Sequence, residues 1–347
     1  MPLENRHRFS LSGIGEKNVA EGWKTLSSDD YLPIVAQCLD YRDKLSLCDW
    51  GYFRFVERLT SEFLGPSKKN EARLMQMYIL AQSGYKVRIA RMNNGLVLLL
   101  PSEETVYAYP YLAIKGQKYY IIDPAAKEQA SLNLFEREFP GEKQFSFRIR
   151  KLPGLPVILT QKKHFQSRFN ANISIDVSVN RNLMDFYEDY PTVGWELYYQ
   201  ASLSDEVRQQ LYPVLKAEIA GKNKRESANI LLHFVQTAFE YMTDQEQFGC
   251  ERPFFADELF FYPYSDCEDR AILFAILIQD LLDLDVVFLN YPGHLATAVC
   301  FDVEVSGDYL RIDEKNYIVC DPTYINSDVG QAMPQFKQVS AHVIRTK

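Results

Sequence analysis

The sequence lacks the features of several common classes of protein. Its 347 residues contain no apolar run of the roughly 20 residues that span a bilayer, and the longest, residues 271–282, is interrupted by Gln279 and Asp280. No run of Lys and Arg exceeds a few residues, and the formal net charge is -8, so the charge pattern of a nucleic-acid-binding protein is missing. We therefore expect neither a membrane span nor a nucleic-acid partner.

Cysteines are few, and their spacing excludes common metal sites. The sequence has neither a C-x-x-C pair nor the Cys/His spacing of a zinc site, so we expect no metal and no other cofactor. Two of the cysteines lie in apolar, strand-like runs, where Cys behaves as a small buried hydrophobe. The six are Cys38, Cys48, Cys250, Cys267, Cys300 and Cys320, of which Cys300 and Cys320 are the strand-like pair.

The N-terminal residues do not have the basic-then-apolar order of a secretory signal. We expect a cytoplasmic location, or the periplasm or cell envelope of a bacterium if a leader has been removed. The sequence gives no indication of the oligomeric state.

The C-terminal part has the pattern of two helices followed by strands. Residues 227–242 have helical spacing of apolar positions, and we expect His233 on this helix to pack or to face solvent. Ser265-x-x-Glu268 has the form of a capping box, so a second helix should begin there. Its body, residues 271–282, is apolar on almost every face, which predicts a helix buried on all sides.

Three short runs after this helix predict an antiparallel sheet, at residues 286–289, 295–303 and 317–320, with a turn at Gly307-Asp308 before the last run. We therefore predict an α+β domain over residues 223–347.

The middle of the chain predicts a different module. Residues 171–179 alternate apolar and polar positions, as expected for a strand with one buried face. Pro and Gly interrupt residues 152–156, and a helix is expected over residues 204–220. We predict a β-rich linking module with a connecting helix at residues 146–222.

The N-terminal part repeats the plan of the C-terminal part. Helices are expected at residues 49–64 and 74–81, and residues 85–89 and 119–124 match residues 285–289 and 317–322. In this match Asn70 corresponds to Cys267, and Asn94 falls near the position of His294. We predict that residues 1–145 are a degenerate copy that keeps the Asp but lacks the Cys and His, the alternative being chance similarity.

The order Cys267, His294, Asp321 is that of a thiol-dependent catalytic triad. A thiol at a helix N-terminus has a lowered pKa, and its own amide can bind an oxyanion. His294, at the start of a strand, would exchange a proton with the thiol, and Asp321 would hold the imidazole. Each residue alone is more often structural, and it is their joint arrangement that favours catalysis.

The neighbours of Cys267 act for and against this chemistry. Asp266, Glu268 and Asp269 add negative charge, which raises the pKa of a nearby thiol. Either these side chains point away from Cys267, or formation of the thiolate depends almost wholly on His294. Residues expected at the substrate cleft are Tyr262, Tyr264, Asp266 and Gly293, although the tyrosines can equally belong to the core. Cys250 is expected to be a bystander.

These motifs resemble the transglutaminase-like superfamily of cysteine enzymes, which share a papain-like core. The resembling motifs are Ser265-Asp266-Cys267-Glu268-Asp269-Arg270, Gly293-His294 and Cys320-Asp321-Pro322-Thr323-Tyr324. The resemblance implies a helix-borne Cys267 packed on an antiparallel sheet, with His294 as base and Asp321 as orienting acid. The chain departs from the family pattern at Asp266 and Leu295, where a Gly and an aromatic residue are common.

We expect a bacterial amide hydrolase that acts on a protein or peptide through a Cys267 acyl-enzyme. Transfer of the acyl group to an amine would use the same first half-reaction. The alternative from another class is a catalytically silent, two-lobed module that binds peptide or glycan.

Overall fold

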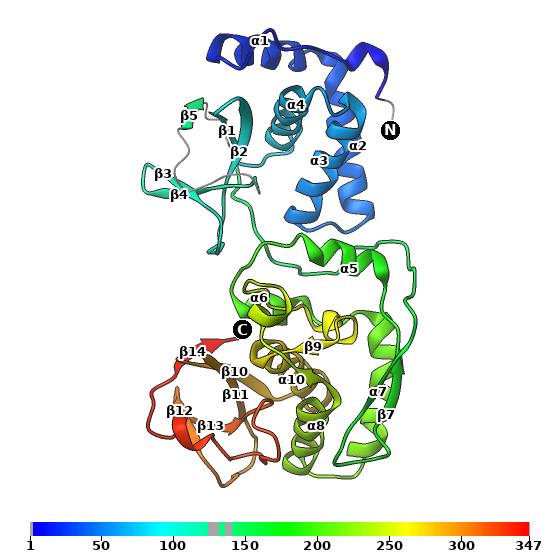
Figure 1. Ribbon diagram of the computed structural model, residues 1–347, viewed down its shortest axis with the longest axis vertical. Helices are drawn as coiled ribbons and strands as arrows, with labels where there is room; N and C mark the ends of the chain where they lie inside the picture. The colour runs from blue at the N-terminus through cyan, green and yellow to red at the C-terminus, as the bar shows by residue number, and fades with distance from the viewer. Residues whose placement is uncertain (1–2, 124–131, 136–140, 347) are drawn as a thin grey trace. The chain divides into compact units, whose positions relative to one another are not determined.

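The structure is a computed structural model that describes residues 3–123, 132–135 and 141–346 (Figure 1). It is a mixed α+β protein, as the sequence predicted, with two five-stranded antiparallel sheets in the described residues. The chain divides into two compact units. The first is Met1–Gly154 with Pro191–Val193, and the second is Leu155–Tyr190 with Gly194–Lys347.

In the first unit, helices lie on one side of a sheet (Figure 1). α3 and α4 pack together, and α4 also contacts β1 and β2. The predicted helix at residues 49–64 is observed with the same bounds, because its apolar positions recur on one face. The helices are α1 (Glu16–Leu26), α2 (Leu32–Lys44), α3 (Asp49–Leu64) and α4 (Lys69–Gln82), and the strands are β1 (Arg88–Met92), β2 (Gly95–Pro101), β3 (Tyr111–Ile114), β4 (Gln117–Ile121) and β5 (Leu132–Phe135).

The second unit is built around α10 (Cys267–Leu282), which contacts α6, α8, β10 and β11. α8 begins after Asn223, whose side chain forms a capping box with Glu226, three residues before the expected start. The other helices are α5 (Arg181–Glu188), α6 (Trp195–Ala201), α7 (Asp205–Ile219), α8 (Lys224–Ala238) and α9 (Asp244–Gln247), and the sheet strands are β10 (Asp285–Tyr291), β11 (His294–Cys300), β12 (Tyr309–Ile312), β13 (Lys315–Cys320) and β14 (His342–Arg345).

The segment predicted as a linking module, residues 146–222, is not a compact unit of its own in this structure. Leu155–Tyr190 and the helices that follow belong to the second unit. The reason is that β7 (Ser174–Val177), paired with β6 (Lys163–Gln166), packs on α7, while β6 contacts α8. The buried face that the alternating pattern predicted therefore packs against helices of the second unit.

The two sheets have the same strand order. The first runs β3-β4-β2-β1-β5 and the second runs β12-β13-β11-β10-β14. A helix pair precedes each sheet, α3 with α4 in the first unit and α8 with α10 in the second. The sequence analysis missed β12 and β14, because both are short strands without a buried residue.

α10 is buried on every face from Glu268 to Ile278, as its apolar sequence predicted. Each fully buried Ile, Leu or Phe side chain on it contributes about 1.5–3 kcal/mol relative to an exposed one. A long, wholly buried helix is a rigid support, and its first residue is Cys267.

Arg270 joins the start of α10 to the end of α8. Its guanidinium is 99% buried and donates through Nη2 to the carbonyl of Phe239 at 2.7 Å, and through Nη1 to that of Gln236 at 3.3 Å. Nε donates to the Ser265 hydroxyl at 3.2 Å. The carbonyls at the C-terminus of α8 are thus satisfied by a charged donor from α10.

Replacement of Arg270 by Met should lower the free energy of unfolding by about 3 kcal/mol, because two buried carbonyls and a buried hydroxyl lose their donor. Urea unfolding monitored by circular dichroism measures this loss. The control is Arg225→Met on the exposed face of α8, which should change stability by less than about 0.5 kcal/mol. Equal effects of the two substitutions would contradict the capping role.

Candidate active site

The structure brings the three predicted catalytic residues to one end of the second sheet. Cys267 is the first residue of α10, His294 is the first residue of β11, and Asp321 directly follows β13. β11 pairs with β13, and the backbone N–H of Leu295, next to His294, acts to lower the pKa of the Cys267 thiol. Packing of α10 on β11 therefore fixes the thiol beside the start of the strand that carries the histidine.

His294 and Asp321 form a buried pair. Nε2 of His294 lies 2.8 Å from Oδ2 of Asp321, and the two side chains are 8% and 2% exposed. The other carboxylate oxygen accepts from the backbone N–H groups of Thr323 at 3.0 Å and Tyr324 at 3.2 Å. With Asp321 as a carboxylate acceptor, Nε2 carries the proton, and Nδ1 is the nitrogen that can exchange one with a thiol.

An aromatic stack holds the imidazole from its face. The ring of His294 lies parallel to Phe336 with centroids 5.1 Å apart, and Phe336 stacks on Tyr291 at 4.6 Å. Phe336 ends a single 3₁₀ turn, Pro334–Phe336, far from His294 in the chain. Sequence patterns do not indicate this role, because one Phe in a loop predicts no particular partner.

Gln236 anchors the loop that carries Asp321. Its Nε2 lies 3.1 Å from the carbonyl oxygen of Asp321, 2.9 Å from that of Tyr324 and 3.1 Å from that of Ser327. The side chain is 99% buried on α8. A Gln on the buried face of an apolar helix is the signal that could have identified it, since a buried amide requires partners.

The N-terminal cap of α10 differs from the predicted one. Asp266, not Ser265, is the capping residue, and it forms a capping box with Asp269 instead of Glu268. Asp269 Oδ2 accepts the Asp266 N–H at 3.1 Å, and Oδ1 accepts the Phe254 N–H at 2.8 Å. The prediction was wrong by one residue because Ser265 serves as the acceptor of Arg270.

The acidic neighbours do not all point away from the thiol. The Cys267 thiol donates to Oε2 of Glu268 at 3.2 Å. Burial raises the pKa of the thiol well above its ordinary value, and Glu268 and Asp266 raise it further, while the Leu295 N–H acts in the opposite sense. In this structure the thiol is therefore protonated and directed at a carboxylate.

A cluster of carboxyl groups surrounds this end of α10. Sets of their oxygens lie within 4.8 Å of one another, and the cluster comprises Asp244, Glu251, Asp266, Glu268 and Asp269. Burial, together with Asp266 and Asp269, raises the pKa of Glu268 to about 11, and burial raises that of Asp244 to about 7. Asp244 and Glu251 were missed because they precede the motif by many residues, on α9 and the loop after it.

The residues predicted to line the cleft have different surroundings. Tyr262 stacks on Phe254 at 4.9 Å and lies beneath the guanidinium of Arg252 at 4.8 Å, which is an aromatic packing role. Tyr264 is half-buried in β9 (Tyr264–Ser265). Gly293 is exposed in the turn before His294 and has a φ of 71°, which favours glycine.

Tyr241, which the sequence analysis did not single out, lies beside the thiol. It is the second residue of β8 (Glu240–Tyr241) and is 49% exposed. Burial of its hydroxyl and the adjacent Cys267 raise the pKa of Tyr241 to about 12. Its ring also lies 5.4 Å from the guanidinium carbon of Arg270.

The first unit has other residue types at the positions that correspond to Cys267 and His294. Asn70, in the first turn of α4, accepts the backbone N–H of Leu96 at 2.9 Å, and in the second unit the N–H of Leu295 acts to lower the pKa of the Cys267 thiol. The strand registers make Gly95 the counterpart of His294, so Asn94 lies next to that position, as expected. Asn70, Gly95 and Asp123 line one cavity of about 670 Å³.

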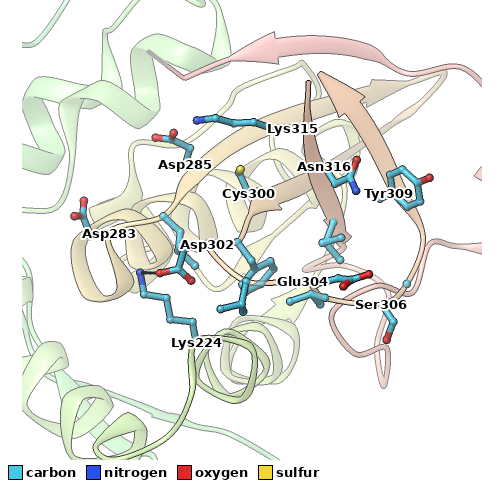
Figure 2. Close-up of a pocket in the computed structure, with 16 residues that line it drawn as sticks. Lys224, Asp283, Asp285, Cys300, Asp302, Glu304, Ser306, Tyr309, Lys315 and Asn316 are labelled. Carbon is cyan, nitrogen blue, oxygen red and sulfur yellow. Dashed lines mark ion pairs between the residues drawn. The ribbon is translucent and has the colours of Figure 1, made fainter. Parts of the chain in front are cut away.

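A large cavity lies away from the candidate site (Figure 2). It has a volume of about 850 Å³ and includes Cys300, the last residue of β11, while His294 is the first. They are six positions apart along the strand, which corresponds to about 20 Å. Lys224 and Asp302 form an ion pair of 2.9 Å beside this cavity. The cavity is distinct from the region around Cys267, because it lies at the opposite end of β11 from His294.

Comparisons of the chain with models of protein families, with curated proteins and with solved structures give no match. Within the described ranges, no helix has the length and apolar character needed to cross a membrane. The chemistry of the site is therefore argued from its geometry.

Substitution of Asn70 by Ala should lower the free energy of unfolding by about 1–2 kcal/mol, because the Leu96 N–H loses its acceptor. Asn94→Ala, at an exposed position in the neighbouring turn, is the matched control and should change stability by less than about 0.5 kcal/mol. Chemical unfolding of both variants tests this. An Asn70 variant as stable as the control would show that the equivalence with Cys267 has no structural role.

Proposed function

We propose that the second unit is a cysteine-dependent acyl-transfer enzyme of the transglutaminase-like kind, with Cys267, His294 and Asp321 as its triad. The observation that carries the proposal is the buried His294–Asp321 pair at the start of β11, the strand on which α10 packs with Cys267 as its first residue. A thiol at the start of a helix, a base and an acid that orients the base are the parts that such catalysis needs. The shared strand order of the two sheets also fits the predicted duplication.

The reaction would begin with transfer of the thiol proton to Nδ1 of His294. The sulfur then bonds to the carbonyl carbon of an amide, and the oxyanion accepts the backbone N–H of Cys267, which as the first residue of α10 has no partner within the helix. The C–N bond breaks as the imidazolium gives its proton to the leaving amine. A thioester remains on Cys267.

Water would complete hydrolysis. His294 takes a proton from the water as its oxygen attacks the thioester, and the C–S bond breaks to release a carboxylic acid and the thiol. An amine in place of water would give transamidation by the same steps. A protein or peptide is the proposed substrate, because it supplies the amide.

Asp321 and its supports would keep His294 in one tautomer throughout. Asp321 accepts from Nε2, and the Thr323 and Tyr324 amides hold the carboxylate. Phe336 restricts rotation of the ring by stacking on it. Preorganisation of this kind avoids reorganisation when charge develops on the imidazole.

A second function, a silent module that binds peptide or glycan, is favoured by a different observation. The Cys267 thiol donates to Glu268, and its pKa is raised, so the nucleophile is held in its unreactive form. In such a module the three residues of the triad would have a structural role and no catalytic one. The two functions differ in whether a bound peptide is cut.

Selective alkylation of Cys267 tests the enzymatic proposal. Iodoacetamide labelling, read by peptide mass spectrometry with and without millimolar divalent cations, should modify Cys267 faster than the exposed Cys250 in at least one of these buffers. His294→Ala should remove this preference, whereas His342→Ala, at an exposed position on β14, should keep it.

Cleavage of a peptide library should follow the same pattern. We expect Cys267→Ala to abolish turnover and His294→Ala to reduce kcat/KM by about a thousandfold, since general base catalysis alone contributes about 10²–10⁴-fold. Binding of peptides without cleavage in any buffer, and labelling of Cys267 no faster than that of Cys250, would establish the silent module instead.

A further inference from the structure

A cavity of the first unit lies where the second unit has its candidate active site. It has a volume of about 670 Å³, and it is lined by Asn70 and Gly95, the counterparts of Cys267 and His294. This volume is within the range of about 300–1,000 Å³ that is typical of small-molecule sites. The first unit therefore has room for a ligand at two positions that carry neither a thiol nor an imidazole.

Gly95 keeps part of this space open. A Cβ atom built on it would lie 3.8 Å from Oδ1 of Asn70 and 3.9 Å from the carbonyl oxygen of Met92, and both are ordinary contacts. Its φ is not in the left-handed region, so the backbone does not require glycine here. A side chain at this position would fit the strand and would occupy volume beside Asn70.

Asn70 presents a hydrogen-bond donor to the cavity. Its Oδ1 accepts the Leu96 N–H at 2.9 Å, which fixes the orientation of the side-chain amide. The other end of the amide, Nδ2, carries two N–H groups and has no partner in the part of the chain that the structure describes. This nitrogen is therefore available to an acceptor on a ligand.

Arg73, one turn further along α4, presents two more donors. Its Nη1 donates to Oε1 of Glu57 and, at 3.0 Å, to Oε1 of Gln76, which orients the guanidinium. Among the described residues, Nε and Nη2 of Arg73 have no partner. These two nitrogens form one edge of the guanidinium, and their spacing matches the two oxygens of a carboxylate.

The charges around the cavity sum to a small positive excess, although the chain has a net charge of -8. Lys69 lines the cavity as an exposed residue without an ion pair to any described residue. Glu57 is shared by Arg54 and Arg73, so these three groups retain one positive charge. Asp123 is the one carboxylate among the described lining residues. Two positive charges against one negative charge favour a monoanion over a phosphate dianion.

We propose that this cavity binds the C-terminal carboxylate of a peptide and does not cut the peptide. The carboxylate accepts from the Nε–Nη2 edge of Arg73, from Nδ2 of Asn70 and from the ammonium group of Lys69. Asp123 offers about four acceptor positions, so beside its present partners it can accept the amide N–H of the last peptide residue. An acceptor among these donors favours a peptide over a simple carboxylic acid, which has no N–H group.

This assignment goes beyond the proposed function, because it gives the first unit a ligand of its own. It depends on residues of the first unit alone and does not require catalysis by Cys267. Capture of a carboxylate by several preorganised donors is a recurring mode of peptide recognition.

Peptide binding is measured in the full chain carrying Cys267→Ala, so that no peptide is consumed. Calorimetric titration compares acetyl-trialanine, which ends in a carboxylate, with the same peptide ending in an amide. We expect the acid to bind about tenfold more tightly, because hydrogen bonds to a charged acceptor are about twice as strong as those to a neutral one.

Three substitutions in this Cys267→Ala chain locate the site. Gly95→Val should abolish binding of the acid by filling the cavity, and Arg73→Lys should weaken it about tenfold by removing the bidentate edge. Lys69→Gln should weaken it about threefold, as expected for an exposed charge. Lys17→Gln, at an exposed position near the start of α1, is the matched control and should leave the affinity unchanged.

Equal affinities for the acid and the amide would overturn the site. So would a Gly95→Val chain that is folded by circular dichroism and binds the acid as tightly as the Lys17 variant does. If Gly95→Val does not fold, the Arg73 and Lys69 variants decide, and affinities equal to that of the control would refute the assignment.

Propionate tests the peptide as the ligand, and it should bind about tenfold more weakly than acetyl-trialanine because it has no N–H group for Asp123. Equal affinities would overturn the peptide ligand. Labelling of Cys267 and peptide cleavage are measured separately in the unaltered chain. Cleavage without carboxylate-selective binding would refute this site and preserve the enzyme, whereas such binding with an unreactive Cys267 would do the reverse.

Discussion

The organisation of the second unit depends on how the first turn of α10 is satisfied away from water. A buried helix start needs acceptors for its amides, and here Asp266 and Asp269 supply them. Arg270, in the same turn, donates to the carbonyls at the end of α8. This exchange fixes Cys267 against β11. It also concentrates acid where a nucleophile would need the opposite, so the folding requirement and the chemical requirement conflict at this one turn.

Much of this arrangement could be predicted from local patterns. The uniformly apolar residues 271–282 predicted a fully buried helix, and the periodicity of residues 49–64 gave α3 with its observed bounds. The separations of Asn70 from Asp123 and of Cys267 from Asp321 predicted two copies of one plan, and both sheets have the same strand order. Such predictions are possible because periodicity and short loops depend on residues that are close together in the sequence.

Other features depend on residues that are distant in the chain. Ser265 had the form of a cap, but Arg270 competes for its hydroxyl, so Asp266 takes that position. Phe336 supports His294 through tertiary packing, for which a single Phe in a loop gives no signal. The position of Gln236 on an apolar helix predicts that its amide has partners, but not that the loop of Asp321 supplies them. The contribution of Asp244 and Glu251 to the carboxyl cluster likewise requires the fold, because α9 and its following loop meet α10 only in three dimensions.

The hydrogen bond that Asn70 makes in the first unit has an evolutionary consequence. The position lies beside the amide at the start of the neighbouring strand, and in the first unit an amide oxygen accepts from that N–H. The side chain in the first turn of the helix can therefore be a thiol in one unit and an amide in the other while the strand order stays the same. A requirement for folding alone would preserve the geometry of this position and be indifferent to the reactivity of the side chain that occupies it.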